Sequence, residues 1–522
     1  MLPLWVSVLL CGVGGVPLPN ARQLDFMEME FTQFMHFSIP TFWKPSDAFL
    51  RGPNPTVGGN CQARVTGSVR DSQNDWHYPC LNANLFNPAE LDIDQWMAAS
   101  AALGMREICL TAKHFGGFTL WPSNFTPYGV HNATAWRGGK GDVLRDFADA
   151  ARRWNISICY YCNPVDDGFL AQFGGVDALE FESRQLGMLG ELLENYGPVN
   201  RFWFDGGSTV RPPNPEARPN GTNTSAIYRK AFALIHERSP STLISPYHGD
   251  ICATSETLYT SSAPRPNSSD ASGCSDPSED GAFFHPSEMH GITMQEGPDG
   301  NTDARPTYWF WHPWACAGNT TGCPWVGHAN ASRIFDGYIA TVGHGGVLNM
   351  NIAPTAQGIM NASVVEVMHE AGKAINDTFL LHSAGTIQAS GPCQEGLAVL
   401  NATGDFDYIV SMEDLSRGQR IGNYSIDFRR WGSSLWETLV PPVQLSGAVS
   451  TRLRDRPDGE DPRDSHVGHK RIDVPIAPTS GIAQVRFNCI RLTNATEAGA
   501  HVYLRRLSLH KRRVPWEDQF LV

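Results

Sequence analysis

Between residues 91 and 250 the sequence alternates between stretches of helical pattern and short apolar runs, and each run ends in polar side chains. These are Lys113 and His114 after the first run, Tyr161, Asn163 and Asp166 after the second, Asp205 after the third, and Tyr247, His248 and Asp250 after the fourth. Tyr161 follows His114 by 47 positions and Asp205 follows Tyr161 by 44, a spacing that suits one strand, one helix and their loops. Strands joined in this way are parallel, so four polar strand ends predict a ring of ligand-facing side chains at one rim of a barrel. The predicted fold class is α/β, a (β/α)8-like barrel of the TIM type that need not be regular.

Local patterns predict the elements of this barrel. The predicted helices cover residues 91–103, 142–154, 179–196, 224–237, 332–342 and 362–375. The predicted strands cover residues 107–111, 156–161, 201–204, 243–245, 308–312 and 347–351, and a further strand within 27–40 ends in His36. Residues 264–303 are rich in loop-forming residues, and a long insertion of this kind usually forms a lid or a wall of a substrate site.

The pattern changes after about residue 382, where helices give way to short strands between Gly, Pro and charged turns. The predicted strands cover residues 398–401, 407–412, 425–428, 484–491 and 502–509. This pattern predicts a C-terminal antiparallel β-sandwich. We therefore expect a catalytic barrel over residues 22–382 and a second domain over 386–522, for which carbohydrate binding is one expected role.

The amino-terminal stretch predicts export. Residues 1–15 combine an apolar run with small residues and resemble a secretory signal, with cleavage expected between residues 15 and 21. Thirteen Asn-x-Ser/Thr sequons support the same expectation. A net charge of −13 argues against a nucleic-acid partner, and no later run is long enough to cross a membrane. The protein is expected to be secreted or to reside in a lysosome- or vacuole-like compartment, and its oligomeric state is left open.

Eleven cysteines remain after removal of the signal, an odd number that leaves at least one without a partner in the chain. Four loop-closing pairs are expected, Cys61–Cys80, Cys252–Cys274, Cys316–Cys323 and Cys393–Cys489. Cys159 and Cys162 have the spacing of a redox motif, but they lie in a predicted strand, where side chains alternate between faces. We therefore expect them on opposite faces and reject the redox interpretation.

Asp205 is the first candidate for chemistry, because it ends a short aromatic strand and precedes two glycines. A carboxylate disfavours strands and is unfavourable when buried without a partner, so Asp205 either faces a ligand or caps the turn through its own backbone. Glycoside hydrolysis requires two carboxylates, and Glu256, Glu279 and Glu288 follow in the next units. No closely spaced metal-ligand motif such as His-Glu-x-x-His occurs, so neither a metal nor another cofactor is expected.

Ordered motifs extend from residue 18 to about residue 430. In the predicted barrel they are Leu110-Thr-Ala-Lys-His114, Leu120-Trp-Pro-Ser123, Leu192-Leu-x-x-Tyr196-Gly and Trp203-Phe-Asp205-Gly. These motifs resemble those of the α-L-fucosidases of glycoside hydrolase family 29. Five further motifs are similar to those of the branch that includes plant fucosidases. They are Leu18-Pro-x-x-Arg22-Gln-Leu, Phe86-Asn-Pro88, Gln95-Trp96, Trp309-Phe-Trp-His312 and, in the second domain, Arg417-Gly-Gln-Arg420.

The resemblance implies a retaining exo-enzyme that removes terminal α-L-fucose from glycans or glycoconjugates through a covalent glycosyl-enzyme intermediate. It places the nucleophile at Asp205 through the Trp-Phe-Asp-Gly motif. The implied sugar-binding positions are His36, Asp75, Trp76, His114, Phe115, Tyr161, Arg305 and Trp309. The proton donor of the family lies in a variable loop after the nucleophile, which favours Glu256, 51 positions after Asp205, with Glu288, 83 positions after it, as runner-up.

One position departs from the family pattern. Relatives carry Lys-His-His-Asp-Gly where this chain has Lys113-His114-Phe115-Gly116-Gly117, so Phe115 replaces a ligand of a sugar hydroxyl. Loss of such a hydrogen bond weakens binding by about 1–3 kcal/mol. Two alternatives therefore remain open, a catalytically inactive, fucose-binding lectin-like protein and a glycosidase for a fucose-like sugar such as L-galactose. Retention of Asp205 and a second carboxylate favours an enzyme, since a lectin does not need two opposed carboxylates.

Overall fold

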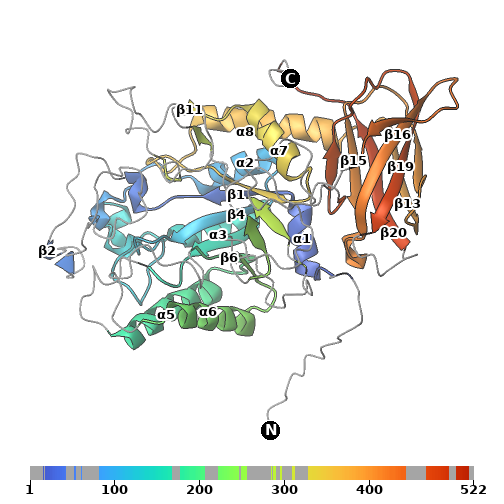
Figure 1. Ribbon diagram of the computed structural model, residues 1–522. Coiled ribbons are helices and arrows are strands. Elements are labelled where there is room, and N and C mark those ends of the chain that lie inside the picture. Colours follow the sequence, from blue (N-terminus) through green and yellow to red (C-terminus); the bar gives the residue numbers. More distant parts are fainter. Residues whose placement is uncertain are drawn as a thin grey trace, which may run out of the picture.

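In the computed structural model of the 522-residue chain, the structure describes residues 16, 18–42, 52–53, 60–61, 81–166, 177–205, 222–245, 249–254, 284, 286–289, 294–296, 309–311, 327–442, 466–492 and 501–516. These residues form two domains that lie side by side (Figure 1). The barrel domain is coloured from blue to yellow in Figure 1, and the C-terminal sandwich is orange to red.

The barrel domain is built on a curled sheet of parallel strands. Their order in space is β7 (Leu243–Ser245), β6 (Arg201–Trp203), β5 (Ser157–Cys162), β4 (Glu107–Lys113), β1 (Phe31–Met35), β12 (Val347–Asn351), β9 (Ser287–Met289) and β8 (Cys252–Thr254). Every pairing between neighbours in this order is parallel. All C-terminal strand ends therefore lie at one rim of the sheet. The predicted barrel-type α/β fold is confirmed.

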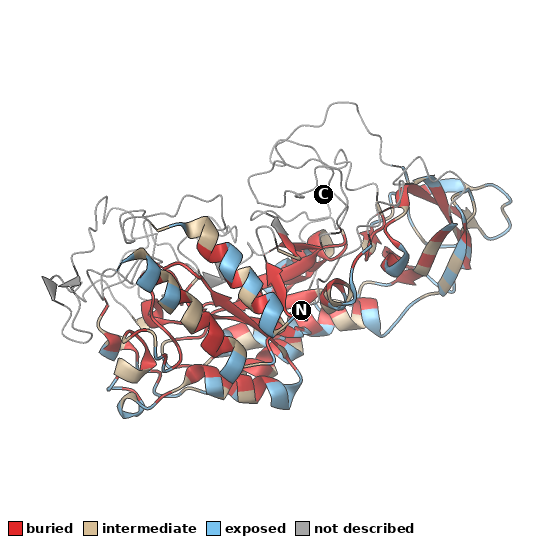
Figure 2. Ribbon diagram, turned by 90° about the horizontal axis from the view of Figure 1, so that it is seen from below, coloured by how far each residue is buried: buried red, intermediate tan, exposed pale blue. Residues whose placement is uncertain are grey.

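Helices cover the outer face of this sheet (Figure 1). They are α2 (Ile93–Leu103), α3 (Val143–Trp154), α5 (Ala178–Asn195), α6 (Thr224–Arg238), α7 (Ala331–Thr341) and α8 (Ala362–Ile375). Local signals set their ends: Asp92 and Asp142 accept hydrogen bonds from first-turn amides, and Gly104 ends α2 in the left-handed conformation. Figure 2 shows buried strands inside and helices whose outer sides are exposed. The predicted helices are confirmed to within one or two residues.

The sequence missed parts of the barrel. Helix α1 (Ala21–Met29) precedes β1, and its Phe26 packs with Leu243 and Val347 at the N-terminal ends of the strands. Strand β9 lies inside the stretch that was expected to be a loop-rich insertion, so Glu288 stands on a barrel strand and not on a loop. The strand expected at 308–312 is wrong, because none of the described residues 309–311 is in a strand, and 309 and 310 lie in a bend.

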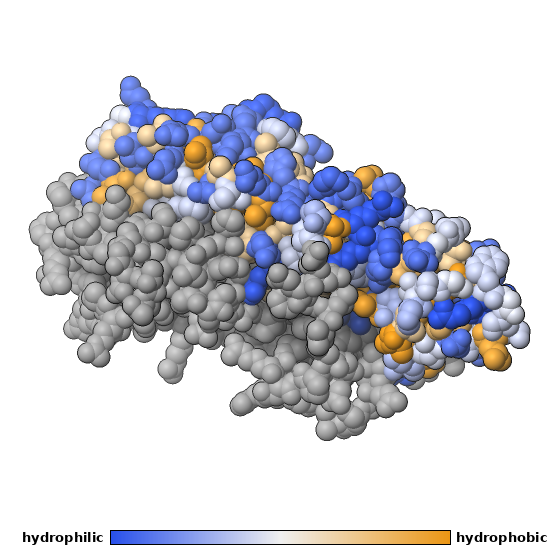
Figure 3. All heavy atoms as spheres, turned by 90° about the horizontal axis from the view of Figure 1, so that it is seen from above, coloured by the Kyte–Doolittle hydropathy of each residue, from blue (hydrophilic) through white to orange (hydrophobic). Residues whose placement is uncertain are grey.

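The C-terminal domain is a sandwich of two antiparallel sheets. One has the order β13 (Thr386–Pro392), β20 (His501–His510), β15 (Tyr408–Glu413) and β18 (Arg471–Asp473), and the other has the order β14 (Ala398–Asn401), β19 (Ile482–Leu492), β16 (Ile421–Arg430) and β17 (Glu437–Val440). A separate apolar core fills the space between the sheets and includes Phe406, Phe428 and Phe487. The predicted antiparallel sandwich is therefore confirmed. Figure 3 shows a described surface that is largely hydrophilic, with apolar side chains scattered over it.

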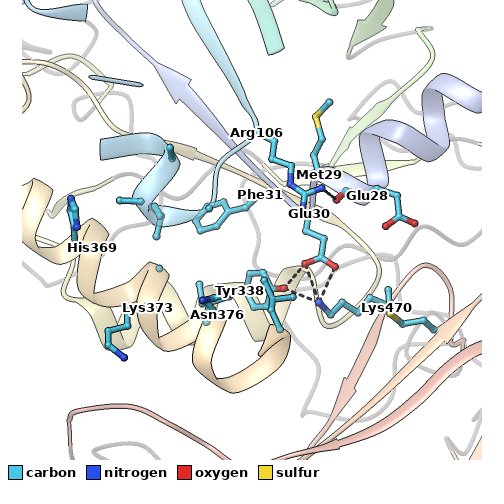
Figure 4. Close-up of a pocket in the computed structure, with 18 of the residues that line it drawn as sticks. Glu28, Met29, Glu30, Phe31, Arg106, Tyr338, His369, Lys373, Asn376 and Lys470 are labelled. Carbon is cyan, nitrogen blue, oxygen red and sulfur yellow. Dashed lines mark hydrogen bonds and ion pairs between the residues drawn. The ribbon is translucent and has the colours of Figure 1, made fainter. Parts of the chain in front are cut away.

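The two domains meet at the N-terminal ends of the barrel strands. Glu30, directly before β1, accepts hydrogen bonds of 2.8 and 3.0 Å from the Lys470 ammonium of the sandwich and another from Tyr338 of α7 (Figure 4). Burial opposes the charge of Glu30, but Lys470, His469 and the Tyr338 hydroxyl together outweigh it and hold the pKa of this carboxyl below its ordinary value. A cavity of about 620 Å³ lies beside this group, between α8 and the sandwich. The interface therefore contains a charged anchor.

The cysteines follow the predicted pattern in part. Cys393 and Cys489 form the predicted disulfide, and Cys159 does not pair with Cys162, which is a buried free thiol. Cys159 instead bonds Cys109, which stands directly opposite on the neighbouring strand β4, a pairing that the sequence did not predict. Cys252 is also disulfide-bonded, and each of the three other expected pairs includes a cysteine outside the described residues. None of the described helices is long and apolar enough to span a membrane.

Candidate active site

Side chains from four neighbouring strands meet at the C-terminal rim of the sheet. His36 follows β1, His114 follows β4, Tyr161 lies near the end of β5, and Asp205 follows β6. The rings of His36 and His114 have centroids 5.7 Å apart, and the rings of His114 and Tyr161 stack at 4.9 Å. Four of the predicted site residues are thus brought together by the geometry of the parallel sheet.

Among the described residues, three neutral groups form hydrogen bonds with Asp205. Its Oδ2 accepts a hydrogen bond of 3.2 Å from the Tyr161 hydroxyl. Its backbone N–H donates to Asn163 Oδ1 at 2.7 Å, and its carbonyl accepts from the Tyr228 hydroxyl. Burial and the negative charge of Asp205 raise the pKa of Tyr161 well above 10, so the phenol stays protonated and continues to donate. Tyr161 therefore fixes the position of the Asp205 carboxylate and does not transfer its proton to it.

Aromatic rings line the inner face of the barrel beside Asp205. Trp203 stacks on Tyr161 with centroids 5.6 Å apart, and both contact Phe34. Because alternate residues of a strand share a face, Trp203 and Asp205 point the same way, as do Phe34 and His36. Trp309 adds a further ring 4.8 Å from His36. A half-apolar wall with one carboxylate is well suited to a ligand that has both hydroxyl groups and apolar faces.

The orientation of His36 follows from a short hydrogen-bond chain. Asn351, at the end of β12, uses its Nδ2 to donate to the carbonyl of Trp309 at 2.9 Å. Its Oδ1 is then the acceptor for His36 Nδ1, which lies 2.8 Å away. Nδ1 of His36 therefore carries a proton. This chain fixes both the His36 ring and the position of Trp309.

Phe115 lies beside His114, with an edge-to-face contact of 5.5 Å between ring centroids, and is 4% exposed. It directly follows the strand end that carries His114, so it is adjacent to the cluster. Whether its ring contacts a bound sugar stays a prediction.

Glu288 has a different environment from the one expected of a proton donor on a loop. It is fully buried, its Oε2 is ion-paired with Arg201, and its Oε1 accepts a hydrogen bond of 2.8 Å from Trp203 Nε1. Burial acts to lower the pKa of Arg201, but Glu107 and Glu288 outweigh burial and raise it. Both oxygens of Glu288 are thus occupied inside the barrel.

Other predicted residues lie outside the described residues: Asp75, Trp76, Glu256, Glu279 and Arg305. The sequence reasoning placed Asn163 at a strand end without giving it a role, and it missed Trp203, Tyr228 and Asn351. Trp203 could have been found, since it lies two positions from Asp205 and is expected on the same face of the strand. Tyr228 and Asn351 come from α6 and β12 and carry no such signal. Among the described residues there is no cluster of His, Cys, Asp or Glu that could hold a metal ion.

Residues 21–279 match the sequence model of the family described as Alpha-L-fucosidase. The chain belongs to this family, the fucosidases of glycoside hydrolase family 29. The predicted family membership, and with it the prediction of a glycoside hydrolase, is confirmed. Asp205 and the rim cluster lie within the matched residues.

The similarity of the chain to members of this α-L-fucosidase family extends across both domains. The chain is 25% identical over 465 residues to Alpha-L-fucosidase 1 of Arabidopsis thaliana, an alignment that covers 81% of this chain and 79% of the plant protein. Its fold is similar to that of a glycoside hydrolase 29 family member from an unknown rumen bacterium, with a TM-score of 0.68 and 22% identity over 97% of this chain and 79% of the other. A Ruminococcus gnavus GH29 fucosidase in complex with fucose gives a TM-score of 0.66 and 16% identity, with 96% of each chain covered.

Proposed function

We propose that the protein is a secreted, retaining exo-α-L-fucosidase that hydrolyses terminal α-L-fucose from glycans through a covalent glycosyl-enzyme intermediate. The proposal rests on family membership and on one observation, the position of Asp205. This carboxylate ends a barrel strand at the rim and is held by Tyr161 and Asn163 beside a wall of aromatic rings.

Asp205 is proposed as the nucleophile. A carboxylate oxygen attacks the anomeric carbon of fucose, the glycosidic bond breaks, and the departing oxygen takes a proton from a general acid. The Tyr161 hydroxyl, a fixed donor to Oδ2, keeps the carboxylate oriented for attack. Water then displaces Asp205 from the sugar, with the former acid acting as base.

Glu256 is proposed as the general acid and base. The runner-up, Glu288, is less suited to this role, because its two oxygens are held by Arg201 and Trp203. A donor needs an oxygen that can reach the leaving group. Glu256 and Asp205 are expected to face each other at about 5–5.5 Å, the separation typical of retention.

The sugar contacts proposed for this function are His36, His114, Tyr161 and Trp309 within the described rim, with Asp75, Trp76 and Arg305 as further positions. Phe115 is proposed to take the place of a hydroxyl ligand, which lowers affinity for fucose without removing the nucleophile. The two alternatives, an inactive lectin-like protein and a glycosidase for L-galactose, receive no support from the relatives found.

The proposal is tested by assaying the purified protein on an aryl α-L-fucoside, with the aryl L-galactoside and other aryl glycosides in parallel. We expect turnover of the fucoside with retention of configuration, so that NMR shows α-L-fucose, and not the β-anomer, as the first product. Preferred turnover of the L-galactoside would transfer the proposal to that sugar, and turnover of no glycoside together with fucose binding would favour the lectin.

A further inference from the structure

A buried ion-pair cluster lies inside the barrel, near the N-terminal ends of β4 and β6. Glu107 of β4, Arg201 of β6 and Glu288 of β9 are all fully buried. Arg201 Nε donates to Glu107 Oε1 at 2.8 Å, its Nη2 lies 2.6 Å from the same oxygen, and its Nη1 bonds both Glu288 and, at 3.1 Å, Ser245. One arginine thus connects strands on both sides of the barrel interior.

This cluster is an unfavourable choice if stability were its only purpose. Removing three charges from water costs free energy that their mutual attraction only partly recovers, and well-packed apolar residues of similar volume often stabilise a core at least as well. Its neighbours are in fact apolar: Leu243 pairs with Arg201 and Val347 with Glu288 in the sheet, and both pack with Phe26. The guanidinium of Arg201 lies 5.0 Å from the ring centroid of Phe26, so the ion pairs lie against this apolar cluster.

The cluster reaches the active site through Trp203. Glu288 Oε1 accepts the hydrogen bond from the indole N–H of Trp203 at 2.8 Å, which fixes the rotation of this buried ring. The ring of Trp203 stacks on Tyr161 at an interplanar angle of 13°, and the Tyr161 hydroxyl donates to Asp205. Glu288 is therefore three contacts away from the carboxylate proposed as nucleophile, with Trp203 and Tyr161 in between.

We propose that Glu288 is a positioning residue for the sugar site: held by Arg201 and Glu107, it orients Trp203 and through Trp203 the Tyr161–Asp205 pair. This inference rests on the proposed function for its kinetic readout. It assigns to Glu288 a role that does not depend on the leaving group, whereas a general acid acts only as far as the departing oxygen needs a proton.

The test is Glu288→Gln, which keeps the shape and an acceptor for Trp203 but removes the charge that pairs with Arg201. We expect kcat/KM to fall by about 10-fold to 100-fold, since small displacements of positioned groups have effects of this size. The fall should be equal for a dinitrophenyl fucoside and for a fucosylated oligosaccharide, and azide should not restore it. Binding of free L-fucose, measured by calorimetry, should weaken in parallel.

Two further variants separate positioning from general loss of structure. Glu30→Gln removes a different ion-paired carboxylate, which is paired with Lys470 at the domain interface, and should leave kcat/KM within about 2-fold of wild type. Trp203→Phe, which removes the N–H donor and leaves the ion pairs intact, should lower kcat/KM to a similar extent as Glu288→Gln. The two effects should not add in the double variant, because they act through one contact. If Glu288→Gln does not fold, Trp203→Phe carries the same test.

Three outcomes would overturn the inference. They are unchanged activity and fucose binding in Glu288→Gln or Trp203→Phe, a loss confined to poor leaving groups that azide relieves, and full additivity in the double variant. Failure of the proposed function looks different, because the wild type would then turn over no fucoside. In that case fucose binding alone decides the role of Glu288, and a wild type that neither binds nor hydrolyses fucosides contradicts both proposals.

Discussion

Two partly buried carboxylates stand at opposite ends of the barrel strands and have different partners. Asp205, after β6, accepts a hydrogen bond from the neutral phenol of Tyr161. Glu30, before β1, accepts two hydrogen bonds from the ammonium of Lys470, which belongs to the other domain. The same chemical group is thus oriented for reaction at one end and charge-paired for docking at the other.

This difference shows that the hydrogen-bonding partners of a carboxylate determine its role. An ammonium partner neutralises a carboxylate and anchors the chain that carries it, as Lys470 does at the domain interface. A phenol whose pKa is well above 10 orients a carboxylate but leaves its negative charge in the site. Position at the C-terminal rim, where barrel active sites are found, agrees with the second role for Asp205.

The largest expected effect comes from removing the rim carboxylate. Asp205→Ala should lower turnover by about 10⁴-fold or more on fucosylated oligosaccharides and activated aryl fucosides alike, because no covalent intermediate forms without a nucleophile. Steady-state assays on both substrates measure it. Substantial activity on either substrate would remove Asp205 from the nucleophile's role and, with it, the contrast with Glu30.

A smaller and more selective effect is expected from the proposed acid. Glu256→Ala should slow hydrolysis of fucosylated oligosaccharides by about 10²–10⁴-fold while sparing the first step on a dinitrophenyl fucoside, whose leaving group departs without a proton. Added azide should restore turnover, since it replaces the water that lacks a base. Wild-type activity of Glu256→Ala on oligosaccharide, with this pattern in Glu288→Ala, would reassign the acid to Glu288.

At the docking end the expected effect is on stability and depends on pH. Burial lowers the pKa of His469 to about 4 from 6.5, against the attraction of Glu30 and Glu28. The folded protein therefore resists protonation that the unfolded chain accepts, so stability is full above pH 6.5 and falls as the pH drops towards 4. The shift corresponds to about 3 kcal/mol.

His469→Gln should remove that acid-dependent loss, as measured by urea unfolding at several pH values. His501→Gln, an exposed position in the same domain, is the matched control and should leave the pH profile unchanged. If the free energy of unfolding falls as steeply at acidic pH in His469→Gln as in wild type, the role assigned to this histidine is contradicted.

The smallest effect is expected at Phe115. If it occupies the place of a hydroxyl ligand, Phe115→His should strengthen fucose binding by about 1–3 kcal/mol, which calorimetry and KM would both report. Unchanged kcat, KM and fucose affinity would place Phe115 outside the sugar site.

Much of the fold could be predicted from local signals. Helix ends at Asp92, Asp142 and Gly104 carry their own caps, and the polar strand ends follow from the repeated spacing. Strand β9 could not be predicted in the same way, because its central residue is Glu288, which fits a buried strand only through Arg201, 87 positions earlier. The Cys109–Cys159 disulfide likewise depends on the register of β4 and β5 and not on sequence spacing.

The candidate site was predictable to the extent that it lies on strand ends. His36, His114, Tyr161 and Asp205 follow predicted strands, so their meeting at one rim required only that the strands be parallel. The hydrogen bonds that hold them come from Asn351 and Tyr228, residues that only the closed fold brings near. Sequence could thus name the reactive groups but not the groups that orient them.

The central claim, that Asp205 forms a covalent bond to fucose, is tested most directly by trapping the intermediate. A 2-deoxy-2-fluoro-fucosyl fluoride carries a good leaving group, which lets the first step proceed. The fluorine at carbon 2 slows hydrolysis of the covalent intermediate that this step forms. Mass spectrometry of the treated protein and of its peptides should show one fluorofucosyl group, attached to Asp205. A label on another residue, or no label in an enzyme that turns over aryl fucosides, would contradict the account.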